Sequence, residues 1–257
     1  MQFNAQMIGM ILLSAYVFVP IIVLIIIYNC LIIRQVGFKI GAFQAIFPIM
    51  LGVVSLLISF AITLALGISA LKLGIAPMII PYPILRSFYS AFLLAAFPEE
   101  FAKLMMILIS CKIFKPKNVH EYTLIGFAVG MGFTFFEEYL YGSGTQIILR
   151  FFFFPFHPVF ASLMAENLGL AARNRKIGKR GNFGLYLKAF FIPVIVHTIY
   201  DAATVKNFIF EVRNDEYLLI AGIAFAYVVL IWSFIFIIRL LIRYFRLAPE
   251  YSCLLTN

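Results

Sequence analysis

Charged residues are scarce in this chain of 257 residues: Asp, Glu, Lys and Arg make up only 12% of it, whereas 64% is apolar. A water-soluble domain is nearer a quarter charged. A chain this apolar could not cover its surface with polar groups, so most of its surroundings must be lipid. The mean hydropathy of +1.04 agrees. These numbers exclude a soluble globular enzyme and a disordered chain, and they predict a polytopic membrane protein.

Cysteine is also rare, and the three cysteines are isolated at positions 30, 111 and 253 without a CxxC pair. The sequence therefore indicates neither a disulfide framework nor a thiolate zinc site. Acidic residues number 11 against 20 basic ones. Because the basic residues gather between apolar runs, the net charge of +9 favours anionic membrane lipid as a partner and not nucleic acid.

Apolar runs long enough to span a bilayer, which takes about 20 helical residues, occur seven times. They lack the alternation of a β-barrel strand. We therefore predict an all-α bundle of about seven transmembrane helices, forming a single transmembrane domain over residues 1–257. The predicted spans are 7–33, 44–71, 84–113, 121–142, 146–171, 186–205 and 216–245. Pro98 is expected to kink or restart the third of them.

The basic residues fix an expected orientation. Alternating the spans puts the loops 34–43, 114–120 and 172–185 on one side with the C-terminal tail. Counting span ends, that side carries fourteen Lys and Arg residues against four on the other. This positive-inside bias places the N-terminus outside and the C-terminus in the cytoplasm, as in a multi-pass protein of the cell membrane.

Ionisable residues inside spans are costly unless they are paired or hydrated, so they mark candidate functional sites. Glu99 and Glu100 are adjacent in the third span, and Lys103 lies on the same helical face as both. The lysine can hold one carboxylate ionised while the other exchanges a proton, which suits a general base with an orienting partner. A structural ion pair is the alternative.

Two further groups follow in the fourth and fifth spans. Phe133 and Glu137 lie one turn apart, next to Glu138, downstream of three glycines that would let another helix approach closely. The alternative is that these acids lie in interfacial water. His157 stands between two prolines near the middle of its span, where a broken helix is tolerated only against protein or water. This pattern predicts a cavity, although a histidine bonded to a carbonyl would also fit.

The sixth span places His197 and Asp201 one turn apart, so the carboxylate could orient the imidazole. By contrast, His120 lies among basic loop residues and is predicted to be on the surface. Glu166 is expected to be solvated or paired.

Histidines and acids that converge inside a membrane make either a zinc site or a metal-free site that activates water. His157, His197 and Glu137 are a sufficient ligand set for catalytic Zn²⁺. However, the HExxH pattern of zincins is absent. The residues are compatible with both chemistries, and the cofactor stays open.

These motifs together resemble the PrsW family of intramembrane proteases, within the larger group of CAAX prenyl endopeptidases and bacteriocin-processing enzymes. The resemblance covers residues 84–205, the predicted catalytic helices. It rests on four elements in order: Glu99-Glu100-x-x-Lys103, Phe133-x-x-x-Glu137, His157 and His197-x-x-x-Asp201. The chain departs from the usual pattern at Glu138, where the family more often has Asn.

The resemblance implies an endopeptidase that cleaves a membrane-anchored protein or peptide, such as an anti-sigma factor or a prepeptide. It implies a catalytic set of five residues, with Lys103 and Asp201 as supports. The five are Glu99, Glu100, Glu137, His157 and His197. From the chemistry, Glu99 or Glu100 is expected to be the general base, and the histidines to stabilise the oxyanion. The alternatives are a proton-coupled transporter, which the lack of an inverted repeat disfavours, and a non-catalytic membrane scaffold.

Overall fold

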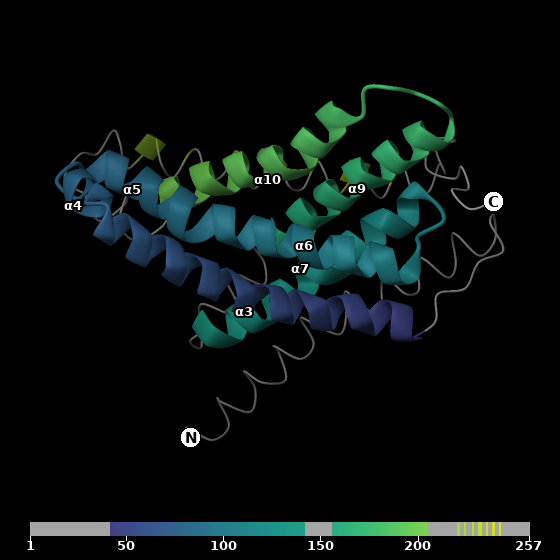
Figure 1. Cartoon of the computed structure of the whole chain (residues 1–257), viewed down its shortest axis with the longest axis horizontal. Coiled ribbons are helices and arrows are strands. Elements are labelled where there is room, and N and C mark those ends of the chain that lie inside the picture. The colour runs from purple at the N-terminus through teal and green to yellow at the C-terminus, as the bar shows by residue number, and fades with distance from the viewer. Residues whose placement is uncertain are drawn as a thin grey trace, which may run out of the picture.

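The computed structural model describes residues 42–141 and 156–204, together with single residues between 220 and 242. All secondary structure within this part of the chain is helical (Figure 1). The first predicted span and most of the last lie outside the described residues. Of the span predicted at 146–171, the structure describes the part from residue 156 onward.

Where the predicted spans fall within the described residues, helices are present, with bounds that differ by up to five residues at the ends that are described. The helices, in order, are α3 (Ala42–Lys72), α4 (Ile75–Ile79), α5 (Pro83–Ala91), η2 (Phe92–Ala96), α6 (Phe97–Phe114), α7 (Val119–Tyr141), α9 (Phe156–Lys176) and α10 (Phe183–Thr204). The third predicted span thus consists of α5, a π-helical segment η2 and α6, and the expected break at Pro98 takes the form of that segment.

Two of the described helices are long and apolar enough to cross a membrane, from Ile46 to Lys72 and from Phe183 to Ala202. This measure rests on length and composition. The number of seven spans and the orientation of the termini stay predictions.

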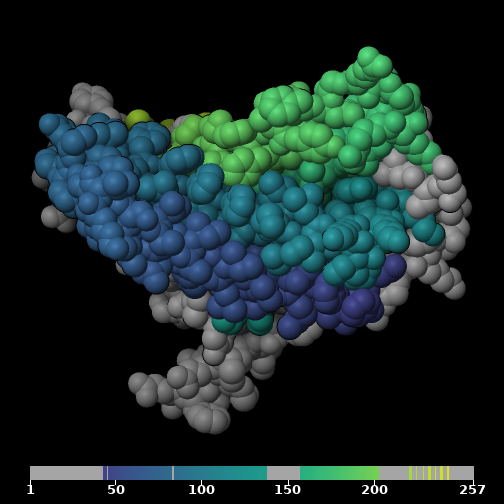
Figure 2. Space-filling model, viewed as in Figure 1, coloured from purple at the N-terminus to yellow at the C-terminus, as the bar shows by residue number. Residues whose placement is uncertain are grey.

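The helices pack around α6 and α7. The most extensive contacts of α7 are with α9 and α3, while α6 also contacts α3, α9 and α10. Figure 2 shows α3 and α10 on either side of α6 on the face viewed. The side chains that α6, α7 and α9 bury between them form the core: Met106, Ile107, Ile125, Val129, Ala161, Met164, Ala165 and Leu168, with Ala189 of α10.

Glycines in α7 set how closely its neighbours approach, as the sequence predicted. A Cβ at Gly126 would collide with the backbone of Ala161 in α9, and one at Gly132 would collide with the carbonyl of Ile49 in α3. Because real Cβ atoms cannot lie so near a backbone, glycine is what allows these helices to touch.

A reciprocal cap starts α7. The side-chain oxygen of Asn118 accepts the Glu121 backbone N–H at 3.0 Å, and the Glu121 carboxylate accepts the Lys117 N–H at 2.7 Å. Two amide donors that the helix itself cannot satisfy are thereby paired.

The predicted surface position of His120 is wrong. Its side chain is buried, with 1% of its surface exposed, because α7 begins before it and turns it inward. Burial lowers its pKa to about 4. Glu166 is also buried, which excludes the first of the two alternatives predicted for it, solvated or paired.

Candidate active site

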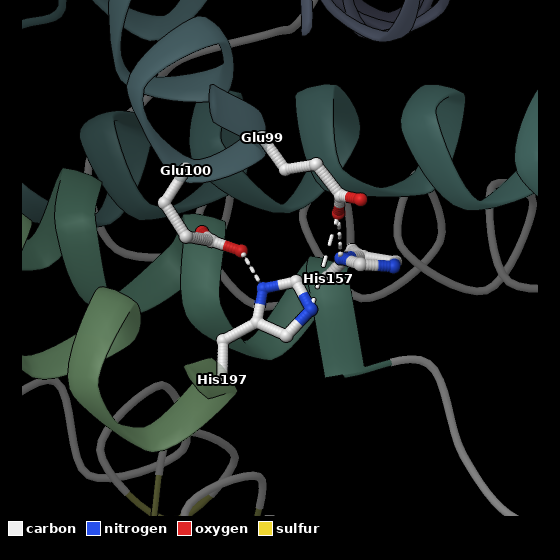
Figure 3. Close-up of side chains that lie close together, drawn as sticks. All are labelled: Glu99, Glu100, His157 and His197. Carbon is white, nitrogen blue, oxygen red and sulfur yellow. Dashed lines mark hydrogen bonds and ion pairs between the residues drawn. The ribbon is translucent and has the colours of Figure 1, made fainter. Parts of the chain in front are cut away.

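The site lies where the first turn of α6 meets α7, α9 and α10. Figure 3 shows Glu99 and Glu100 projecting from α6 toward His157 and His197. His157 belongs to the first turn of α9, and His197 lies in the second half of α10. Four residues that are up to 98 positions apart in the sequence therefore face one another.

Glu100 lies at the buried end of the site. Its side chain is fully buried, and its Oε1 lies 2.6 Å from the ammonium nitrogen of Lys103 and 2.8 Å from Nδ1 of His197. The carboxylate thus accepts hydrogen bonds from its own helix and from α10. This pairing offsets part of the cost of removing both charges from water, although the other oxygen, Oε2, is buried without a hydrogen-bond partner.

Lys103 links three helices. Besides Glu100, its Nζ lies 2.7 Å from Nδ1 of His157 in α9 and 4.2 Å from the ring centroid of Phe133 in α7. An ammonium group only donates, so Nδ1 of His157 must be the acceptor in this contact. The cation also lies within range of a favourable interaction with the aromatic face.

Carboxylates hold both histidines, His157 at one ring nitrogen and His197 at both. Nε2 of His157 lies 2.6 Å from Oε2 of Glu137, while Nδ1 of His197 donates to Glu100. Nε2 of His197 lies 3.2 Å from Asp201, as the four-residue spacing predicted. Carboxylates in these places fix the orientation of both rings.

Glu99 occupies the middle of this arrangement. Its Oε2 is buried and has no hydrogen-bond partner, yet it lies 4.0 Å from Nδ1 of His157, 3.9 Å from Nε2 of His197 and 4.0 Å from Nζ of Lys103. Buried carboxylate oxygens are rarely left unsatisfied. Three nitrogens around one such oxygen mark the point where a further polar ligand belongs.

Access to the site is uneven. The Glu99 and Glu137 side chains keep 19% of their surface exposed, and Asp201 keeps 15%, whereas Glu100 and Lys103 keep none. Glu99 is therefore the more accessible of the two adjacent carboxylates, while the Glu100–Lys103 pair is shielded.

The structure brings together eight of the nine residues that the sequence singled out: Glu99, Glu100, Lys103, Phe133, Glu137, His157, His197 and Asp201. The ninth, Glu138, lies in α7, but its side chain is outside the described part of the structure. The roles of these residues stay predictions. Sequence reasoning had no signal for the contact between Lys103 and His157, because these residues lie 54 positions apart on different helices.

Comparison with known proteins identifies the family. Residues 44–238, more than half of the chain, match the family described as PrsW family intramembrane metalloproteases. The chain belongs to the PrsW family. The match extends beyond the resemblance seen in residues 84–205, because it includes nearly all of α3 and much of the last predicted span. No curated protein and no solved structure matches the chain.

The donor set of this PrsW-family site fits the metal that the family description implies. Among the described residues, one ligand atom from each of Glu99, Glu100, His157 and His197 falls within 4.8 Å of the others. Two imidazoles and a carboxylate with an unsatisfied oxygen suit Zn²⁺. The sequence offered Glu137 as a candidate carboxylate ligand. In the structure, Glu99 lies between the histidines and Glu137 lies behind His157.

Proposed function

We propose that this PrsW-family protein is an intramembrane endopeptidase that hydrolyses one peptide bond of a membrane-anchored protein or prepeptide. The supporting observation is the unsatisfied oxygen of Glu99, which faces two oriented imidazoles within a helical bundle. Amide hydrolysis needs a group that accepts a proton from water, positive or polar groups near the developing oxyanion, and a proton for the leaving amine. The site offers all three.

Glu99 is the residue placed to accept the proton. It is the more accessible of the two adjacent carboxylates, and its Oε2 has no competing hydrogen-bond donor. The oxygen of the water forms a bond to the scissile carbonyl carbon while its proton passes to Glu99. The same proton then moves to the amide nitrogen as the carbon–nitrogen bond breaks, so that Glu99 ends the cycle as it began.

The remaining groups stabilise charge and geometry. Nε2 of His197 borders the same point as Glu99 and can donate to the carbonyl oxygen as it becomes negative. His157 borders this point with Nδ1, which accepts from Lys103, so its part is to hold the ammonium group there. Lys103 adds a positive charge behind His157, and Glu100 holds both Lys103 and His197 in place. Asp201 and Glu137 orient the two imidazoles.

A divalent metal would be held by Glu99, His197 and the Nδ1 lone pair of His157 that otherwise accepts from Lys103. Glu99 would then be a ligand instead of the proton acceptor. The chemistry that such an ion supplies is Lewis acidity toward water and a carbonyl oxygen. Glu100 and Glu137 would then be the carboxylates that fix the ligand histidines from behind, an arrangement common around catalytic zinc.

The test is a comparison of membranes from cells that carry the wild-type protein or the Glu99→Gln variant. Quantitative mass spectrometry should find a single-span protein that accumulates uncut in the variant, with its cleaved fragment missing. In proteoliposomes, the purified wild-type protein should cleave that substrate, and Glu99→Gln should lower the rate constant by about 100-fold or more, since a positioned general base contributes at least this much.

Glu121→Gln is the matched control. It makes the same chemical change in a carboxylate that caps α7, and glutamine keeps an acceptor oxygen for the cap. This variant should process the substrate normally. If Glu99→Gln membranes instead contain the same fragments as wild-type membranes, and the purified variant cleaves at the wild-type rate, the protein is not a protease of this mechanism.

A further inference from the structure

The helix that carries Glu99 and Glu100 is interrupted immediately before them. Pro98 lacks a backbone N–H, so it cannot donate to the carbonyl of Leu94, four residues earlier, as an α-helix requires. The proline ring would also collide with that carbonyl in a regular helix. The structure accommodates both effects with η2, in which the N–H of Phe97 reaches back five residues to the carbonyl of Phe92.

The Leu94 carbonyl finds its donor on another helix. Oγ1 of Thr63, in the middle of α3, donates to it at 3.1 Å. In lipid a freed carbonyl must be satisfied by neighbouring protein, and hydroxyl side chains together with local π-helical turns are the usual means. Thr63 and η2 are both present here.

Thr63 differs from every other hydroxyl residue of α3. Ser55, Ser59 and Ser69 each donate to a carbonyl of their own helix, three or four residues earlier. Thr63 alone of these four donates across a helix interface. One turn further along α3, Gly67 faces the Leu94 side chain, and a Cβ at this glycine would lie 3.8 Å from Leu94 Cδ2, an ordinary van der Waals distance. The two helices therefore meet at Leu94 through a hydrogen bond and lie within packing distance there.

We propose that Thr63 is a positioning residue for the Glu99–Glu100 pair. It acts through the Leu94 carbonyl, which it holds in the displaced position that Pro98 and η2 require. The direction in which α6 leaves η2 sets where both carboxylates point. Thr63 contacts none of the candidate catalytic residues in the interactions described above, and it belongs to none of the motifs that the sequence singled out. This inference rests on the proposed protease function.

The experiment compares Thr63→Val, which removes the hydroxyl at nearly constant shape, with Thr63→Ser, which keeps it. The probe is the single-span protein that accumulates in Glu99→Gln membranes, reconstituted with each purified variant in proteoliposomes. Thr63→Val should lower kcat about tenfold with KM unchanged, the loss expected when one net hydrogen bond no longer supports the transition state. Thr63→Ser should restore the wild-type kcat. Ser69→Ala, which removes an exposed hydroxyl of the same helix, should match the wild type.

A second comparison, made in a Pro98→Ala variant, tests whether Thr63 acts through the Leu94 carbonyl. In Pro98→Ala the backbone N–H of residue 98 can donate to Leu94, so adding Thr63→Val should change kcat less than about twofold. An equal loss in both backgrounds would overturn the inference, because the valine would then act through packing alone. If Pro98→Ala is itself inactive, the inference is tested by comparing Thr63→Ser with Thr63→Val in the otherwise wild-type protein.

Two other outcomes also count against the inference: a wild-type kcat in Thr63→Val, or a loss in Thr63→Ser as large as that in Thr63→Val. Failure of the protease proposal would look different. In that case Glu99→Gln would process the same membrane proteins as the wild type, whatever residue stands at position 63.

Discussion

Lys103 shows how a single buried charge connects the residues of the site. Its ammonium group has no exposed surface and contacts an acid of its own helix, an imidazole of α9 and an aromatic ring of α7. A buried ammonium is tolerated only when its donors are paired. Glu100 and His157 provide that pairing, and in return the lysine fixes which nitrogen of His157 accepts and which one faces Glu137.

At the residue scale we predict how the site binds zinc. The purified wild-type protein should retain about one Zn²⁺ per chain, and Glu99→Gln and His197→Gln should each lose it. The first change replaces a charged carboxylate with a weakly binding neutral amide, and the second removes an imidazole nitrogen. Glu137→Gln should weaken binding about 10- to 100-fold without abolishing it, since Glu137 acts through His157. Elemental analysis and competition with a chromophoric chelator measure both quantities.

Glu121→Gln should leave the zinc content unchanged, because Glu121 caps α7 and is not among the four clustered donors. A wild-type protein that holds no zinc even in the absence of a chelator would contradict the prediction that the site binds zinc. Glu99 would then serve as the proton acceptor without a metal.

At the scale of helices, close approach between α7 and α9 determines where His157 lies. Gly130 in α7 faces the backbone at the start of α9: a Cβ there would lie 2.5 Å from the carbonyl oxygen of His157 and 2.5 Å from Cα of Pro158. No side chain can give way at this contact, because the neighbours are backbone atoms. Any residue larger than glycine must push the two helices apart and move His157 away from Lys103 and Glu137.

Gly130→Ala should therefore destabilise the protein by about 1–3 kcal/mol and lower the cleavage rate at least about tenfold. Thermal unfolding in detergent and substrate cleavage in proteoliposomes measure the two effects. Gly184→Ala is the matched control, since a Cβ at Gly184 in α10 meets nothing within 4 Å and alanine favours a helix. Equal stability and activity of the two variants would show that the α7–α9 contact tolerates a side chain.

At the scale of the whole molecule, the positions of the loops between helices relate to the predicted orientation of the protein in the membrane. The α6–α7 and α9–α10 loops lie at the end of the bundle where α3 begins, and α4 lies at the opposite end (Figure 1). Lys115 and Lys179 belong to the first end, and Leu73 belongs to the second. The basic residues of these two loops are thus gathered at one end of the bundle.

We predict that single cysteines at Lys115 and Lys179 react with a membrane-impermeant maleimide only after the cells are permeabilised, whereas Leu73→Cys reacts in intact cells. The background would have Cys30, Cys111 and Cys253 replaced by serine. All three test positions are exposed in the structure, so burial would not hide them. Labelling of Lys179→Cys in intact cells would show that the orientation is reversed.

Periodicity and residue type predicted the features that depend on one helix at a time. The i, i+4 spacing placed His197 beside Asp201, and the spacing of Lys103 placed it on the face of Glu100. Pro98 predicted an interruption, which the structure realises as η2. These predictions succeed because a helix fixes the relative positions of its own side chains within one turn.

What the sequence determined by itself was therefore the all-helical class, the helices within the described part of the chain, the residues that face one another at the site and the family. Only the tertiary structure decided that Glu99 rather than Glu137 lies between the histidines, that His120 is buried, and that Thr63 supports the Leu94 carbonyl. Each of these depends on the rotation and separation of helices far apart in the chain. Those quantities follow from packing at glycines and buried side chains, to which no local pattern along the chain gives access.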